Sequence, residues 1–554
     1  MVYDGMPWIG DDQGEKLCIR PEMANRHGLI AGATGTGKTV TLKVMAESFS
    51  EMGVPVFLAD VKGDLSGMCC PGEDDSKVRE RVEQLGLEGK GFARRGYPVC
   101  FWDIFGEMGL PLRTTISEMG PTLLARLMGL TDTQTDVLTI VFRIADEEGL
   151  LLLDVKDLRS MLAYVAENNK EYALRYGSLP KQSINSILRN LASLEEQGGE
   201  QFFGEPALDI RDWFRQDSQG RGMVNILHSE SLIHNPKMYS TFMLWMVSEL
   251  FEVLPEAGDC PKPKMMFFFD EAHLLFDDAP KALMQKLEQV VKLVRSKGVG
   301  IYFITQSPKD IPDGILGQLG NKIQHALHAY TPAEQKAVKA AADSFRENPA
   351  FDTREAISQL GIGEALVSFL DKDGVPSAVR RAKILPPQSL MGPISQSERT
   401  AQTQGQMLYS KYGTMIDRDS AYEFFQRKLK QQETFQKQQE ELGARKKEQE
   451  KAEREAQKEA LRQEKEREKE EERRRREEIR EKERKEKALA REAQQREQAK
   501  KKAVASVAKT AAGTIGREVG NEIGKNVGGS FGKKLGGNLG ASIGRGLLGT
   551  LFGK

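Results

Sequence analysis

The octapeptide GATGTGKT, residues 32–39, constrains the fold of this chain more than any other segment. It matches the pattern G-x-x-x-x-G-K-[S/T]; the apolar segment HGLIAGA, residues 27–33, leads into it, and a helix is predicted after it from about Thr39 to Met52. Glycines let the main chain approach phosphate groups closely, and the amino end of the helix favours negative charge. The octapeptide therefore predicts a nucleotide-phosphate site in an α/β fold.

Each part of the octapeptide has an expected role. The main-chain N–H groups would contact phosphate oxygens, Lys38 would reach the β- and γ-phosphates, and the Thr39 hydroxyl would bind Mg²⁺. The predicted nucleotide-binding residues are Gly32, Ala33, Thr34, Gly35, Thr36, Gly37, Lys38 and Thr39. The implied cofactors are ATP and Mg²⁺, although no residue that reads the base stands out.

A second segment, MMFFFDEAH at residues 265–273, supplies the acidic groups that such a site needs. Its apolar part predicts a buried strand that ends at Asp270 and Glu271. Asp270 is expected to hold Mg²⁺ through water, and Glu271 to polarise the water that attacks the γ-phosphate. A base beside the metal ligand favours a hydrolytic motor over a kinase, which must exclude water.

Two further residues are weaker candidates. A strand predicted at Gly300–Thr305 would deliver Gln306 to the γ-phosphate as a polar sensor, and Thr305 is the less favoured choice for that role. Arg295 comes shortly before this strand. Its position alone favours a solvated, basic helix end over an arginine finger that reaches a neighbouring subunit.

Short apolar segments followed by turn residues predict the strands of a mostly parallel sheet with helices on both faces. A helix is expected between two of them, at 280–297, and an edge hairpin is expected from 365–370 with 377–385. The predicted strands are 27–33, 54–61, 97–104, 223–227, 265–270, 300–305 and 323–330.

The composition changes after the first four hundred residues. Residues 386–405 are rich in Pro, Ser and Gln, and residues 421–502 consist mostly of Glu, Lys, Arg, Gln and Ala. A solvated helix with i,i+4 ion pairs is favoured there over a coiled coil or a nucleic-acid-binding arm. The predicted divisions are a globular domain at 1–390 with a helical insertion at about 117–220, a linker at 391–420, a charged helical segment at 421–502 and a glycine-patterned tail at 503–554.

In that tail, glycine recurs at every fourth position from Gly516 to Gly544, each time after an apolar residue. This spacing fits an interfacial or self-associating helix, but glycine lowers helix stability, so a disordered tail is an equal alternative.

The remaining bulk properties exclude several classes of protein. Lys and Arg number 80 against 81 Asp and Glu. The chain therefore lacks the overall basic excess that would indicate a polyanion as its partner. The five cysteines form no metal-binding spacing, and neither a signal peptide nor a transmembrane segment is expected. These features predict a soluble, cytoplasmic chain.

Two partial motif matches are set aside. DEAH at 270–273 would indicate a superfamily 2 helicase, but the motif of its second domain is missing. The GTPase-like pairing of DVKG at 60–63 with Asn321-Lys322 lacks the guanine-reading carboxylate, because Gln324 stands in its place.

Taken together, the segments resemble the HerA/FtsK superfamily of hexameric ATPases, particularly its HerA-like helicase C-terminal branch. The resemblance covers about residues 5–390. It rests on NRHGLIAGATGTGKT, LADVKGDLSG, FFFDEAH, VRSKGVGIYFITQSP and LGNKIQHALHAYTP. It implies a RecA-like P-loop fold, ATP with Mg²⁺, assembly into a homo-hexamer and DNA as a partner.

The resemblance also implies roles for single residues. Glu271 would be the catalytic base, Gln306 the sensor and Arg295 the finger that acts on a neighbouring subunit. Asp60 would add to the outer shell of the metal.

Three functions follow from the sequence. The first is a ring-forming, ATP-driven DNA translocase or helicase-like motor, with Lys181 and Arg189 as candidate pore residues. The second is a nucleotide-controlled assembly or scaffold ATPase whose tail would bind a protein or a membrane surface. The third, a phosphotransferase, is disfavoured by Glu271.

Overall fold

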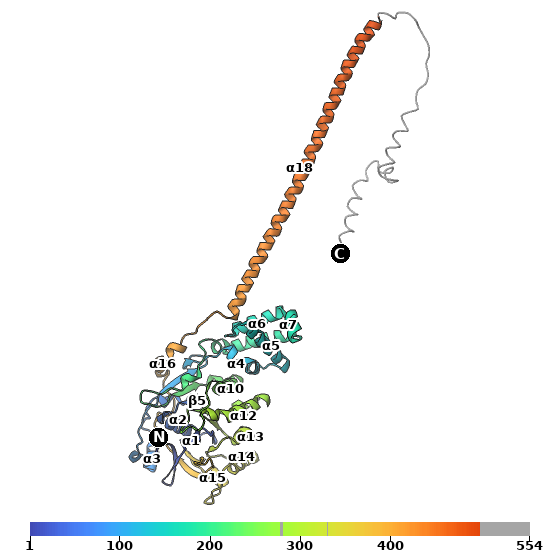
Figure 1. Cartoon of the computed structure of the whole chain (residues 1–554). Coiled ribbons are helices and arrows are strands. Elements are labelled where there is room, and N and C mark those ends of the chain that lie inside the picture. Colours follow the sequence, from blue (N-terminus) through green and yellow to red (C-terminus); the bar gives the residue numbers. More distant parts are fainter. Residues whose placement is uncertain (277–280, 330, 499–554) are drawn as a thin grey trace. The chain divides into compact units, whose positions relative to one another are not determined.

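The computed structural model describes residues 1–276, 281–329 and 331–498, and a 13-stranded mixed sheet organises the part that ends at Gln436 (Figure 1). Its parallel part carries the predicted strands of the nucleotide site. In spatial order these strands are β11 (Asn321–Gln324), β4 (Gly28–Ala31), β10 (Val299–Thr305), β9 (Met265–Phe269), β5 (Val56–Asp60), β8 (Val224–His228), β6 (Val99–Asp103) and β7 (Leu110–Pro111). The mostly parallel α/β fold expected from the sequence is confirmed.

The antiparallel part continues the sheet beyond β11. It consists of β12 (Glu364–Ser368), β13 (Arg380–Ile384) and β2 (Met6–Asp12), with β1 (Val2–Tyr3) and β3 (Glu15–Cys18) both paired to β2. The predicted hairpin is present, but it is not the edge of the sheet, because β2 pairs with β13. A Cβ atom at Gly10 would lie 3.0 Å from the Lys383 main-chain oxygen, so a side chain there would crowd β13.

The predicted strand 323–330 is too long. Regular pairing ends at Gln324, because the chain then turns beneath the phosphate loop. Ala326 accepts a hydrogen bond from Ala33 N at 2.9 Å, which takes its main chain out of the sheet and into contact with that loop. Residue 330 lies outside the described residues.

Alternate side chains of the central strands enter two hydrophobic cores, one on each face of the sheet. Phe267 and Phe269 belong to the core that includes α10 (Pro236–Val253) and α12 (Lys281–Val294). Met266 and Phe268 belong to the other, which includes α2 (Lys38–Glu51). The strand is therefore buried on both sides, as its continuous apolar sequence predicts.

Smaller elements complete the sheet layers. They are α1 (Pro21–Ala24), α3 (Ser76–Leu85), α11 (His273–Phe276), α13 (Asp313–Leu316), α14 (Pro332–Asp343), α15 (Thr353–Gln359) and the 3₁₀ turns η1 (Ser66–Cys69), η2 (Glu88–Lys90), η4 (Ile210–Trp213), η5 (Ser231–His234), η6 (Arg295–Lys297) and η7 (Pro308–Asp310).

Helices occupy the stretch between β7 and β8, where the sequence predicts an insertion, and they gather at one end of the unit (Figure 1). Thr115 and Asp154 begin two of them through reciprocal capping hydrogen bonds. These helices are α4 (Ile116–Met128), α5 (Asp132–Glu148), α6 (Val155–Glu167), α7 (Asn169–Tyr176), α8 (Lys181–Leu194) and α9 (Glu200–Phe202), with a π turn at Glu195–Gly199.

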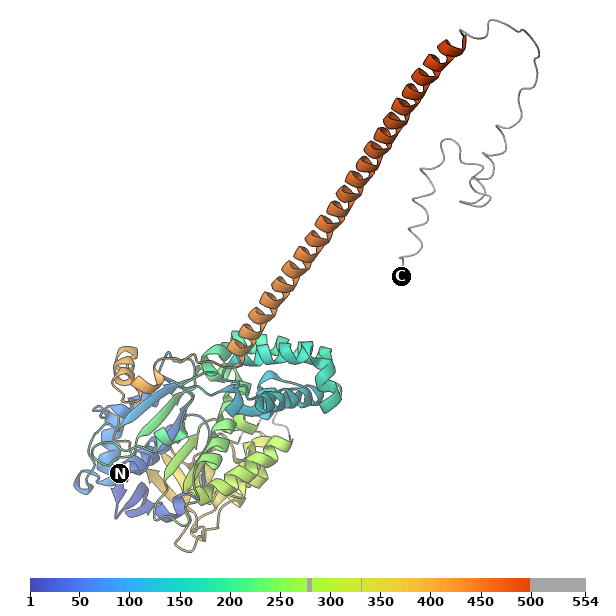
Figure 2. The same ribbon diagram turned by 45° about the horizontal axis from the view of Figure 1, so that its top comes forward.

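The segment that composition marks as a linker is in fact a packed part of the fold, and we call residues 386–425 the C-terminal strap. It contains α16 (Gln396–Gln404), which contacts β6, and α17 (Tyr409–Tyr412) (Figure 2). The Glu47 carboxylate accepts hydrogen bonds from Gln388 N at 2.8 Å and Ser389 N at 3.0 Å. Because main-chain N–H groups of the strap donate hydrogen bonds to Glu47 of α2, the strap is held in place despite its Pro- and Ser-rich sequence.

The end of the strap is fixed to the helical insertion. Asp157 in α6 accepts hydrogen bonds from the Ser420 hydroxyl at 2.6 Å and from Tyr422 N at 2.8 Å. The first compact unit therefore extends to Gln436, beyond the predicted boundary at residue 390.

The charged segment forms α18 (Ala421–Gln498). In its part beyond Lys437, i,i+4 ion pairs such as Arg476 with Glu472 occur, as the charge pattern predicts. Within residues 1–276, 281–329 and 331–498, no helix combines the length and apolarity needed to span a bilayer. The glycine-patterned tail lies outside the described residues.

Candidate functional site

The phosphate-binding loop connects β4 to α2 at the carboxyl edge of the sheet. Gly37 has a φ of 112°, a conformation that residues with side chains rarely adopt, and it directly precedes the helix. Gly32 lies against His325, and a Cβ atom on Gly32 would come within 2.5 Å of the His325 Cβ. The two glycines are thus required by the path of the main chain.

His325 packs against the phosphate-binding loop and is held there by two hydrogen bonds. Its Nε2 lies 2.9 Å from the Thr41 hydroxyl, and its Nδ1 lies 2.9 Å from the Glu364 main-chain oxygen. Burial lowers the pKa of His325 to about 4, so the imidazole is neutral at physiological pH. No sequence signal distinguished this histidine, because its role depends on a fold contact.

The Lys38 side chain is buried inside the loop. Its ammonium group donates hydrogen bonds to the Gly32 oxygen at 2.6 Å and to the Ala33 oxygen at 3.1 Å. Burial lowers the pKa of Lys38, and the charge of Lys62 lowers it further, whereas Glu271 and Asp270 raise it. The structure therefore brings Lys38 and the two acids into one electrostatic neighbourhood.

Strand order explains this proximity. β10 lies between β4 and β9, with Thr305 beside Ala31 and Phe303 beside Phe269. Two strand spacings amount to roughly 10 Å, and all three strands point the same way, so the phosphate loop and the acids share one edge.

Asp270 and Glu271 follow β9 in a tight turn. Asp270 is buried; its carboxylate accepts a hydrogen bond from Glu271 N at 2.9 Å, and its main-chain oxygen accepts one from the Tyr239 hydroxyl, also at 2.9 Å. Glu271 has a φ of 48°, which is unusual for a non-glycine residue. This strained conformation is held by contacts from α10 and from the turn itself.

The charge state of this turn depends on its neighbours. Burial raises the pKa of Asp270 to about 6, although the Lys62 charge opposes this shift. The Lys62 ammonium lies 3.3 Å from the Glu271 carboxylate, and the His273 ring lies 3.5 Å from its other oxygen. Lys62 stands in the quoted segment LADVKGDLSG, yet sequence reasoning assigned no role to it.

The donor set fits Mg²⁺, which prefers hard oxygen ligands. The Thr39 hydroxyl at the start of α2 and the Asp270 carboxylate would hold the ion, and a divalent cation would favour the ionised carboxylate that burial disfavours. When bound, the metal would neutralise charge on the β- and γ-phosphates.

The two weaker candidates, Gln306 and Arg295, lie at opposite ends of β10. Gln306 is exposed and directly follows β10, between the phosphate loop and the acids. Arg295 precedes the amino end of β10, and the seven residues of that strand separate it from the carboxyl edge by roughly 20 Å. Arg295 is therefore not part of the site of its own chain.

Asp60 ends β5, and its carboxylate binds the main chain of the turn that follows this strand. Its carboxylate accepts a hydrogen bond from Leu65 N at 3.2 Å, and burial, reinforced by Asp64, raises its pKa to about 7. Its other charged neighbours include Arg399 of the strap. The outer-shell role expected for Asp60 stays a prediction.

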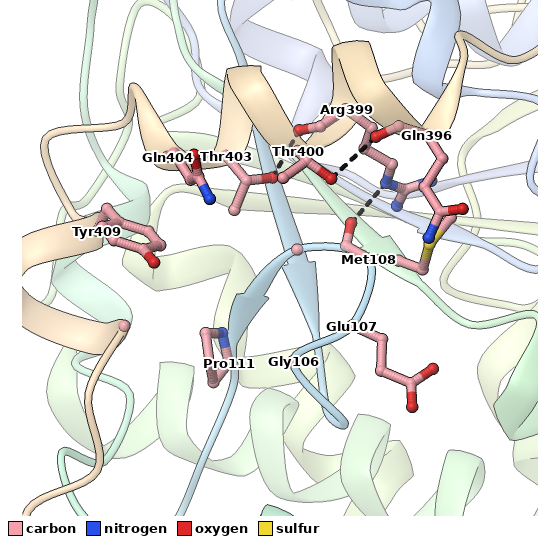
Figure 3. A pocket seen from close by; sticks show the side chains of 12 residues that line it. Gly106, Glu107, Met108, Pro111, Gln396, Arg399, Thr400, Thr403, Gln404 and Tyr409 are labelled. Atoms are coloured by element: carbon pink, nitrogen blue, oxygen red, sulfur yellow. Dashed lines mark hydrogen bonds between the residues drawn. The ribbon is translucent and has the colours of Figure 1, made fainter.

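A separate cavity of about 140 Å³ lies between the loop joining β6 to β7 and α16 (Figure 3). There, Arg399 donates a hydrogen bond from Nε to the Met108 main-chain oxygen, and its guanidinium lies over the Phe101 ring. This cavity lies where the C-terminal strap packs against the loop between β6 and β7, and none of the predicted site residues lines it.

Comparison with known proteins points to one family. The family model for the helicase HerA-like C-terminal region matches residues 8–481. The DNA double-strand break repair helicase HerA of Saccharolobus solfataricus is 23% identical over 388 residues, which cover 66% of this chain and 66% of that protein. The HerA of Sulfolobus acidocaldarius is 22% identical over 373 residues, covering 65% of each. The chain thus spans slightly less than two thirds of the length of these relatives.

Among solved structures, VirB4 of Thermoanaerobacter pseudethanolicus superposes with a TM-score of 0.45 at 16% identity, over 69% of this chain and 97% of that one.

Proposed function

The chain belongs to the HerA-like helicase C-terminal family, and on this premise we propose that it is an ATP-hydrolysing motor that works on DNA as a ring of subunits. The observation that carries the proposal is the strand order β4–β10–β9, which puts Lys38 and the turn with Asp270 and Glu271 at one edge of the sheet. Their sequence separation exceeds two hundred residues, so only the fold unites them.

The chemistry follows from the positions of these groups. The loop N–H groups and Lys38 would hold the triphosphate, while Thr39 and Asp270 would hold Mg²⁺. Glu271 would accept a proton from the attacking water, and Gln306 would contact the γ-phosphate from the end of β10. The bond broken joins the γ-phosphorus to the β–γ bridging oxygen, and the products are ADP and phosphate.

Assembly into a ring, with six subunits as the family resemblance implies, is part of the proposal. Arg295 lies far from the site of its own chain and is partly exposed, which suits a residue that acts on a neighbouring subunit. Lys181 and Arg189 are both exposed on α8, as residues that contact DNA must be. The relatives named above are DNA helicases, and this supports DNA as the substrate.

The decisive experiment measures phosphate release from ATP by the purified protein, with and without duplex DNA, beside Glu271→Gln. We expect hydrolysis that duplex DNA stimulates, and a loss of about 10²–10⁴-fold in kcat for the variant with ATP binding retained. Near wild-type turnover by Glu271→Gln would refute the assigned base. An ATPase rate that DNA leaves unchanged, together with no salt-sensitive DNA binding, would refute the DNA motor.

Arg295→Ala tests the ring. Because the residue would act on the adjacent subunit, the variant should bind ATP normally and hydrolyse it poorly, and mixing it with Lys38→Ala protein should restore some activity. Absence of any rescue in mixed assemblies would count against a finger that acts between subunits.

A nucleotide-controlled scaffold is the second candidate, and the long exposed part of α18 favours it. A variant that ends at Gln436 keeps the first compact unit. If that variant retains DNA-stimulated hydrolysis but loses assembly or cellular position, the removed part is an adaptor.

A further inference from the structure

Glu271 forms an ion pair with Lys62, a residue that has no role in the hydrolysis proposed above. The Lys62 Nζ lies 3.3 Å from Glu271 Oε1; the Lys62 side chain is 41% exposed and that of Glu271 is 11% exposed. Lys62 follows β5, which pairs directly with β9, so the ion pair joins the ends of two adjacent strands. Partial burial acts to lower the pKa of Lys62, but the Asp270 and Glu271 carboxylates outweigh it and raise that pKa.

The second oxygen of Glu271 is less well satisfied. Glu271 Oε2 is buried and has no hydrogen-bond partner among the residues that the structure describes, since His273 Nδ1 at 3.5 Å is too distant for a good bond. The backbone of Glu271 is also strained, with a φ of 48°. Among the described residues, the carboxylate is therefore held mainly by Lys62, which contacts one of its two oxygens.

Lys62 shares its surroundings with Lys38. Its charge contributes to the lowered pKa of Lys38, after burial, so the two ammonium groups lie near each other beside two carboxylates. A γ-phosphate held by Lys38 would place further negative charge in the same small region. An oxyanion of higher charge competes effectively for a long, partly exposed lysine side chain.

We propose that Lys62 is shared between two anions: it holds Glu271 while the site has no nucleotide, and it moves to the γ-phosphate when ATP binds. Lys62 is then a positioning residue for Glu271 in one state and a phosphate ligand in the other. Its departure leaves the Glu271 carboxylate available to accept a proton from water. The inference rests on the proposed ATPase function and deepens it, because release of the base would require the phosphate that ADP lacks.

The test measures nucleotide binding without turnover. Isothermal titration calorimetry with Mg²⁺ compares AMP-PNP, a non-hydrolysable analogue that keeps a γ-phosphate, with ADP. The proteins are Lys62→Met, Glu271→Gln, the double variant and the unaltered chain. Lys77→Met, at an exposed lysine on α3, is the matched control, and Lys62→Arg should restore most of the affinity.

We expect Lys62→Met to weaken AMP-PNP binding by about tenfold or more in the Glu271→Gln background, and by a clearly smaller factor when Glu271 is present to compete for the lysine. ADP binding should change by less than about threefold in both backgrounds. Thermal unfolding without nucleotide verifies that each variant is folded.

Three results would overturn the inference: an unchanged affinity for AMP-PNP, an equal loss for AMP-PNP and ADP, or the same loss in both backgrounds. Different results would refute the proposed ATPase function. A chain that shows the coupled binding pattern yet releases no phosphate from ATP would refute hydrolysis alone, and a chain that binds neither nucleotide would refute both.

Discussion

The Tyr239 hydroxyl donates a hydrogen bond to the main-chain oxygen of Asp270 across 2.9 Å, and this bond joins α10 to the end of the strand that precedes Asp270 and Glu271. Burial raises the pKa of Tyr239 well above its ordinary value, so the donor stays protonated. The next residue, Glu271, has a left-handed backbone conformation. One buried hydroxyl thus supports the strained turn from which the proposed base projects.

Tyr239→Phe should loosen this turn. Loss of one buried hydrogen bond is expected to lower the free energy of unfolding by about 1 kcal/mol, and imprecise placement of Glu271 should lower kcat by up to about tenfold. Denaturant unfolding and phosphate release measure the two effects. Tyr3→Phe, which removes an exposed hydroxyl, should change neither, and a Tyr239→Phe enzyme with unaltered kcat would show that the bond serves stability alone.

Two glycines of the phosphate loop should respond differently to alanine. In Gly32→Ala the new Cβ would meet the His325 Cβ at 2.5 Å, a contact that no side-chain rotation relieves, so the loop must shift and ATP binding should be lost. In Gly35→Ala the new Cβ has open space around it and the cost is backbone strain at a φ of 79°, about 1–2 kcal/mol. Calorimetric ATP affinities should therefore rank the unaltered chain first, Gly35→Ala second and Gly32→Ala last. The reverse order of the two variants would contradict the assigned contact.

Asp60 should make stability depend on pH. Burial, with Asp64, raises its pKa from 3.8 to about 7 in the folded protein, so between these values the folded state binds more protons than the unfolded state. Its contribution to stability is present at low pH and is lost as pH rises towards about 7, at a rate approaching 1.4 kcal/mol per pH unit. Asp60→Asn cannot ionise, so the stability of the wild type relative to this variant should fall over that range in denaturant unfolding. Asp373→Asn, at an exposed site, should leave the slope unchanged, and parallel curves for wild type and Asp60→Asn would disprove the buried, protonated state.

The anchor of the C-terminal strap should be a stability determinant. Glu47 is 1% exposed and accepts hydrogen bonds from two main-chain N–H groups and from the Ser389 hydroxyl. Glu47→Ala leaves these donors buried without an acceptor, and we expect a loss of about 2–4 kcal/mol in the free energy of unfolding. Glu83→Ala on the exposed face of α3 is the control and should have no measurable effect. Limited proteolysis should cut the variant first within the strap, and cleavage elsewhere would argue against this anchor.

The nucleotide site was largely predictable because its chemistry demands a local pattern. The glycines and Lys38 form one continuous motif, and Asp270 and Glu271 end an apolar strand, so their meeting follows from the rule that parallel strands share one carboxyl edge. Lys62 and Tyr239 escaped prediction because each acts through a contact between elements. A lysine after a strand and a tyrosine inside an apolar helix carry no signal of that contact in their own neighbourhoods.

Other parts of the fold escaped for different reasons. β2 contains Pro7 and Gly10, residues that disfavour a strand on propensity, and yet Gly10 is what allows close packing against β13. The strap has the composition of a linker because its partners are polar: Lys43 and Glu47 lie on a helix whose sequence does not reveal that nearly every side chain is buried. Composition separates apolar from polar segments, but it does not identify a polar segment held by buried hydrogen bonds.

The strap also defines a path for mechanical force. Tension applied at Ala421, where α18 begins, would pass through Asp157 to the insertion, and through Ser389 to Glu47 on α2. α2 starts at Lys38. A force applied to the carboxyl-terminal segment would therefore act on the same helix that presents this lysine to the phosphates.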